Sequence, residues 1–217
     1  MRGFTALSFG PASVTAVDAT FSRPRLGDLG RRLGGAAGNA RLTAVTGAVL
    51  VVLLAVEGAT IPFLRPLLSV HIFVGMLLIG PVALKLASTG YRFTRYYRGG
   101  REYVEHGPPP PLMRVLVAPV LVLATLTLFG TGVLLVAAPH RGAVLGLHKA
   151  SFVVWFGACS VHVLAYALRT LRELVASRIA GESLRIALLV GAIAVGVAVA
   201  VATYPLASPW LDGALRR

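Results

Sequence analysis

Three of the five histidines lie inside long apolar stretches, where an imidazole is costly unless it has a partner. They are His71, His148 and His162, whereas His106 and His140 fall in polar loops and need no special role. A polar ring within hydrocarbon usually faces the interior of a helix bundle, as a ligand, a relay or a packing residue. The three histidines in apolar stretches are therefore the candidates for chemistry.

The spacing of these histidines favours axial ligation of haem. His71 lies about four residues into the second apolar stretch and His148 about five into the fourth, roughly 6–8 Å below the outer membrane boundary. Two imidazoles at matched depth on parallel helices suit opposite faces of one haem iron. His162 follows His148 by 14 residues. That interval is about 40° short of four helical turns with a rise of roughly 21 Å, so His162 suits a second cofactor deeper in the bundle.

Glycines near these histidines are compatible with a flat macrocycle. Gly75 follows His71 by one helical turn, and Gly130 and Gly132 lie in the third apolar stretch. A missing side chain lets a planar group approach a helix. Small residues also serve helix packing in membranes, and the glycines taken alone favour that interpretation.

Other chemistries lack their motifs. The only cysteine, Cys159, excludes a disulfide framework, a cysteine-rich zinc site and the C-x-x-C-H attachment of covalent haem. The chain contains no H-E-x-x-H metal motif and no G-x-S-x-G nucleophile elbow. No catalytic residue is predicted.

The elements that position the histidines are predicted to be membrane-spanning helices. The 217 residues are 56% apolar and 13% charged, with a mean hydropathy of +0.79, which excludes both a soluble globular domain and a disordered chain. Five stretches have the roughly 20 apolar residues that a spanning helix needs: 43–61, 67–88, 115–138, 143–168 and 186–204. The expected fold is an all-α integral membrane bundle of five transmembrane helices, with a four-helix haem-binding part and one extra C-terminal helix.

The basic residues predict the orientation in the membrane. Fifteen arginines lie in the N-terminal tail and in the loops at 89–114 and 169–185. The loops and the C-terminal tail on the other side of the membrane contain only four basic residues. Because basic loops stay in the cytoplasm, the N-terminus is expected inside and the C-terminus outside a cell membrane. The net charge of +13 is then a topology signal and not a sign of nucleic-acid binding. Aromatics and arginines at 91–97 suit lipid headgroups.

Three regions are expected along the chain. Residues 1–41 are polar and arginine-rich and are predicted to be a disordered cytoplasmic tail. Residues 42–170 form the four-helix transmembrane domain. Residues 171–217 hold a loop, the fifth helix and a short outer tail, and Gly191 and Gly196 of that helix suggest helix packing.

Several motifs resemble those of a known family. They are Ser69-Val-His-Ile-Phe-Val-Gly75, Phe129-Gly-Thr-Gly-Val133, His148-Lys-Ala-Ser-Phe152 and Val161-His-Val163. Over residues 41–170 the chain resembles the four-helix di-haem cytochrome b family, the membrane anchor of respiratory formate dehydrogenases and nickel–iron hydrogenases. The resemblance implies that His71 and His148 bind an outer haem b.

The resemblance is incomplete at the inner haem. His162 matches one inner ligand, but residues 40–47 contain no histidine or methionine where the family has the other. Lys85 could face His162, although a lysine must lose its proton to bind iron, and snorkelling toward the inner headgroups is favoured for it. One haem is therefore expected, with a second at His162 left open.

Two functions follow from these observations. The first is a membrane b-type cytochrome that carries electrons between a quinone pool and a redox partner subunit. In it, Arg65, Arg141 and Lys149 either pair with haem propionates or face water and lipid phosphates. Such a chain would be an electron-transfer subunit of an oxidoreductase and not a stand-alone catalyst. The alternative is a cofactor-free transporter or assembly subunit, in which His162, Lys85 and Glu57 are proton-relay or structural polar residues.

Overall fold

The computed structural model describes residues 34–105, 107–108, 110–138, 142–175 and 180–215. The described residues form helices and no strand. The elements are α2 (Gly35–Thr60), η1 (Ile61–Phe63), α3 (Leu64–Tyr97), α4 (Arg101–Glu105), the π-turn η2 (Met113–Val117), α5 (Ala118–Ala137), α6 (Gly142–Val175), α7 (Glu182–Thr203), η3 (Tyr204–Ala207) and α8 (Ser208–Leu215). Most of the predicted tail, together with His106, His140 and Arg141, lies outside the described residues.

Four helical stretches of the described chain are long and apolar enough to cross a membrane. They are Gly35–Tyr97, Met113–Ala137, Gly142–Val175 and Glu182–Leu211. The prediction of an all-α membrane bundle agrees with this finding. The stretches number four and not five because α2, η1 and α3 form one unbroken helical run of 63 residues.

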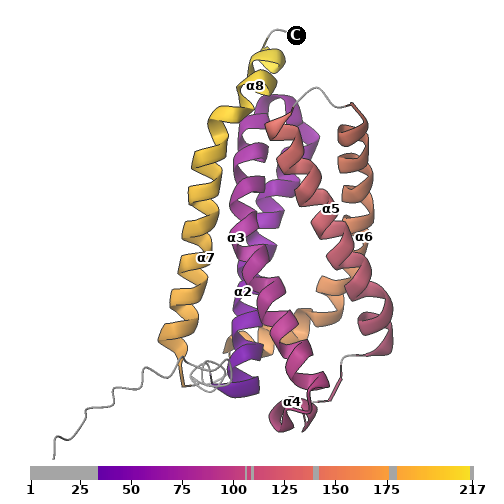
Figure 1. The fold of residues 1–217 in the computed structure, drawn as a ribbon, viewed down its shortest axis with the longest axis vertical. Helices are drawn as coiled ribbons and strands as arrows, with labels where there is room; N and C mark the ends of the chain where they lie inside the picture. Colours follow the sequence, from indigo (N-terminus) through magenta and orange to yellow (C-terminus); the bar gives the residue numbers. More distant parts are fainter. Residues whose placement is uncertain (1–33, 106, 109, 139–141, 176–179, 216–217) are drawn as a thin grey trace, which may run out of the picture.

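This long run is folded back on itself as a hairpin. Pro62 lies in the first turn of η1, where α2 gives way to α3. The two limbs then lie side by side, because the Asn39 side chain donates to the Ser88 carbonyl at 3.2 Å and the Thr43 hydroxyl donates to the Ser88 hydroxyl at 3.2 Å. Figure 1 shows α2 and α3 together at the centre of the molecule.

Helix α7 packs against α3 through two glycines. A side chain on Gly80 would collide with the backbone of Ala192 and Gly196, and one on Gly196 would collide with the Leu77 carbonyl. That carbonyl has no helical donor, because Pro81 four residues later lacks an N–H group. The free carbonyl and the missing side chain explain why the two backbones approach so closely.

Helices α5 and α6 form the other flank of the molecule (Figure 1). The Trp155 indole of α6 donates to the Thr125 hydroxyl of α5 at 3.0 Å. The Trp210 indole of α8 donates to the Leu135 carbonyl of α5 at 2.9 Å. The predicted outer tail after the fifth helix is therefore partly helical and contacts the bundle, a feature that hydropathy does not report.

The first helix also begins earlier than the apolar pattern predicted. It begins at Gly35, inside the predicted 1–41 tail, and Gly34 and Gly35 have positive φ angles of 83° and 64°. The Glu102 carboxylate of α4 accepts a hydrogen bond from the Ala36 N–H at 3.2 Å. A residue 66 positions away in the sequence thus accepts a hydrogen bond from one of the backbone N–H groups that have no partner within the first turn of α2.

The glycine contact between α3 and α7 gives a matched test. Gly80→Ala and Gly196→Ala should destabilise the protein by about 1–3 kcal/mol, because overpacking forces the helices apart. Gly191→Ala is the control, since a side chain there would meet nothing within 4 Å. Thermal unfolding in detergent measures the difference, and equal melting temperatures for all three variants would contradict the close α3–α7 contact.

Candidate functional site

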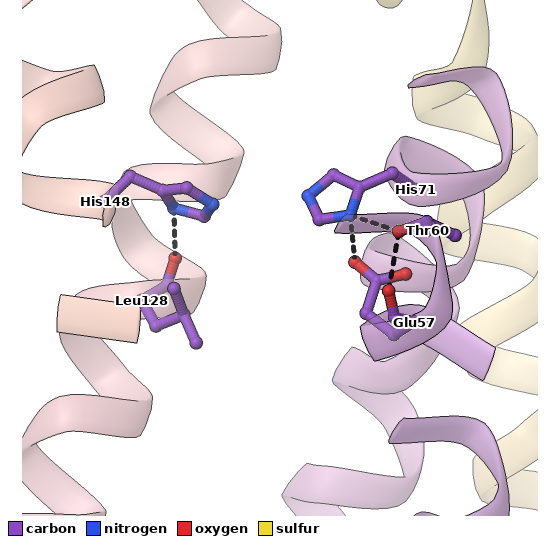
Figure 2. A network of polar contacts seen from close by, with 5 residues as sticks. All are labelled: Glu57, Thr60, His71, Leu128 and His148. Carbon is purple, nitrogen blue, oxygen red and sulfur yellow. Dashed lines mark hydrogen bonds and ion pairs between the residues drawn. The ribbon is translucent and has the colours of Figure 1, made fainter. Parts of the chain in front are cut away.

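His71 of α3 and His148 of α6 face each other between the two flanks of the molecule. Figure 2 shows the two imidazoles pointing toward one another, each with one ring nitrogen bonded to its own flank and the other directed at the opposite ring. Both residues are half-buried. The structure thus brings together the two histidines that the sequence places at matched depth.

The Nδ1 atom of His71 is held by two groups of α2. It lies 2.9 Å from Glu57 Oε1 and 2.9 Å from Thr60 Oγ1. The Thr60 hydroxyl donates its own hydrogen to the Glu57 carbonyl at 2.5 Å, so only its lone pairs remain for the ring. Because both neighbours accept, Nδ1 carries the proton and Nε2 presents a lone pair.

His148 is held in the same way by α5. Its Nδ1 atom lies 3.1 Å from the Leu128 carbonyl and 3.0 Å from Thr131 Oγ1. The Thr131 hydroxyl donates to the Thr127 carbonyl at 2.7 Å and is therefore also an acceptor for the ring. The His148 Nε2 atom is left with its lone pair directed at the facing ring.

Two of the predicted glycines make room for these side chains. A Cβ on Gly132 would lie 3.4 Å from His148 Cε1, and a Cβ on Gly75 would lie 3.4 Å from Glu57 Oε1. Both glycines therefore border the histidine arrangement itself. Gly130 has nothing within 4 Å of such a position and takes no part in this contact.

Two basic residues lie at the same end of the bundle as the histidine pair. Arg65 is in the first turn of α3 and Lys149 follows His148 directly, and both are exposed. They place positive charge near the histidine pair. Arg141, the third residue predicted to act in this way, lies outside the described residues.

The end of the bundle that holds Lys85 and His162 differs from its prediction. Lys85 does not snorkel toward the headgroups, because its Nζ atom donates to the Thr43 carbonyl of α2 at 2.6 Å. Gly47 allows this approach, since a Cβ there would lie 2.8 Å from Nζ. His162 is half-buried, and its ring centroid lies 4.9 Å from that of Tyr166.

Sequence reasoning missed the polar partners of the histidines. The sequence predicts Glu57 only as a proton-relay or structural residue of the alternative function, and it does not single out Thr60 or Thr131. The available signal was position: Glu57 and Thr60 occupy the last turn before η1, and His71 follows it closely in α3. A tight hairpin must bring such residues together.

The donor set fits an iron that already has in-plane ligands. Within the described residues, no group of three or more histidine, cysteine or acidic side chains could hold a metal ion. A free zinc ion needs three or four protein ligands. Two facing imidazoles would suit a metal that brings its other ligands with it, as haem iron does. Gly132 beside the His148 ring, Gly75 beside Glu57 and the orphaned Glu57 Oε2 atom are compatible with a group bound there.

Comparisons of the chain with protein-family models, with curated proteins and with solved structures found no match. The resemblance to the di-haem cytochrome b family therefore rests on the sequence motifs. The geometry of His71 and His148 stands independently of that resemblance.

Proposed function

We propose that this protein is a membrane b-type cytochrome that transfers electrons, with one haem b between His71 and His148. The observation that carries the proposal is the pair of Nε2 atoms directed at one another from α3 and α6. When bound, haem b supplies a one-electron couple of its iron. No catalytic side chain is needed for that role, so the protein would act as a subunit of an oxidoreductase.

The chain's own residues would orient the ligands and exclude water. Glu57 and Thr60 fix the ring of His71, while Leu128 and Thr131 fix that of His148, and fixed second partners raise ligand basicity and hold the tautomer. The apolar helices around the pair lower the local dielectric. Arg65, Arg141 and Lys149 are proposed to pair with the propionates.

Five membrane crossings are proposed for the bundle. The hydrogen bonds between α2 and α3 support two antiparallel crossings within the 63-residue run. The segments predicted as arginine-rich loops begin inside helices, with Arg92 and Arg95 in the last turns of α3 and Arg169 and Arg172 in the last turns of α6. These helix ends lie at the same end of the molecule as the start of α2, which supports a cytoplasmic N-terminus and an outer C-terminus (Figure 1). The partners proposed are membrane lipid, a quinone pool and a redox subunit.

One haem per chain is proposed, not two. Lys85 is the nearest candidate for the missing inner ligand, but its amine is bonded to the Thr43 carbonyl. This hydrogen bond holds the Nζ atom against α2, and a role as iron ligand would require it to break. His162 then has Tyr166 beside it and no paired ligand from the helix-one segment 40–47.

A second candidate function is a cofactor-free relay or assembly subunit. The Glu57–His71 contact favours it, because a carboxylate and an imidazole in an apolar bundle also suit proton transfer. Lys85, held by Thr43, has a structural role in this reading. A reduced-minus-oxidised absorbance spectrum of the purified protein separates the two functions, since only the cytochrome has haem bands.

The orientation is tested with reporter fusions. A reporter after Gly100 and one at Arg217 should report opposite sides of the membrane, the first in the cytoplasm, because basic loops are retained there. If both fusions report one side, the five-crossing topology is wrong.

The ligand pair is tested by substitution. His71→Ala and His148→Ala each remove one axial ligand and should abolish or strongly reduce haem retention, measured by the Soret absorbance per protein. His106→Ala and His140→Ala, at positions that the sequence predicts to lie in polar loops, should retain the native spectrum. Haem binding that survives His71→Ala unchanged would refute the assignment.

The haem number is tested at the inner end. The pyridine haemochrome assay should give about one haem per chain for a single bis-histidine site, and His162→Ala should leave that ratio unchanged. A ratio near two that falls in His162→Ala would establish a second site, with Lys85 the first residue to test as its other ligand.

A further inference from the structure

The two histidines of the pair have unequal partners. Nδ1 of His71 donates to a carboxylate, Glu57 Oε1, at 2.9 Å. Nδ1 of His148 donates to a neutral backbone carbonyl, that of Leu128, at 3.1 Å. Both rings also have a neutral threonine hydroxyl as a second acceptor. The difference between the two sides is therefore one negative charge.

That charge is poorly compensated by the rest of the described chain. The Glu57 side chain is 15% exposed, and its second oxygen, Oε2, is buried without a hydrogen-bond partner. Within the described residues its one ion-pair contact is His71. Gly75 itself places no side chain against Oε1, since a Cβ there would lie 3.4 Å from that atom. The effect of the carboxylate is thus directed at the His71 ring.

We infer that Glu57 sets the reduction potential of the haem iron through His71. This inference rests on the proposed function. A carboxylate that accepts the Nδ1 proton draws it away from the ring and makes the imidazole a more anionic and more basic ligand. An anionic ligand stabilises ferric iron over ferrous iron, which holds one more electron, so the carboxylate lowers the potential. Glu57 is a positioning residue, because it acts through His71.

The experiment is a redox titration of the purified holoprotein. Glu57→Gln removes the charge, but its amide oxygen can still accept from Nδ1, so the variant should keep its haem. At the wild-type midpoint, its ratio of reduced to oxidised haem should rise by about tenfold, which is about 59 mV for a one-electron couple. Glu57→Asp keeps the charge with a shorter reach and should give a smaller rise.

Neutral partners supply the matched controls. Thr60→Val removes an acceptor from the same Nδ1 atom, and Thr131→Val removes the corresponding one from His148, and neither changes a charge. Both should shift the ratio by less than about threefold if the charge dominates. A Glu57→Gln potential equal to that of the wild type, or matched by Thr60→Val, would overturn the inference.

Two further outcomes are distinguishable. If Glu57→Gln does not retain haem, the titration of Glu57→Asp becomes the test. A midpoint potential of Glu57→Asp equal to that of the wild type would then overturn the inference. Wild-type protein without haem would refute the proposed function itself. A wild-type cytochrome whose potential ignores Glu57 would refute only the role of Glu57.

Discussion

An apolar helix bundle offers no water to its polar groups, and this constraint accounts for the site. A buried donor or acceptor is stabilised by a partner within the chain, because an unpaired polar group in hydrocarbon costs several kcal/mol, on the order of 2–7. The Lys85 amine meets the Thr43 carbonyl, and the Trp155 indole meets the Thr125 hydroxyl. The Nδ1 atoms of His71 and His148 meet acceptors in the same way.

Two helical hairpins bring the histidines and their polar partners together. In the α2–α3 hairpin, the last turn of α2 lies against the first turns of α3, so Thr60 reaches His71 across 11 residues of sequence. In the α5–α6 hairpin, Thr131 reaches His148 across 17 residues. Each hairpin therefore builds and orients one histidine by itself. The pair forms where the two hairpins face each other, and α7 supports the first hairpin from its other side through Gly80 and Gly196.

Hydropathy and helical phase predict what depends on one helix at a time. They predicted an all-α membrane bundle and the shared depth of His71 and His148, because span length and rise per residue are local properties. They did not predict features that depend on a contact with a residue distant in the sequence. Glu102 satisfies the start of α2 at Gly35, and the Thr43 carbonyl holds Lys85 inside the bundle. Neither partner can be read from the neighbouring sequence, since both contacts join segments more than 40 residues apart.

The two neutral rings cannot form a hydrogen bond with each other, and this leaves both Nε2 atoms available to a third group. Their Nδ1 atoms carry the protons, so two Nε2 lone pairs face one another, and two acceptors make no hydrogen bond. An electron-pair acceptor such as a metal centre would satisfy both lone pairs at once. Because both rings are already oriented by their own hairpins, little ordering remains to oppose binding. In the proposed cytochrome, the pair would therefore be preorganised for ligation before the cofactor binds.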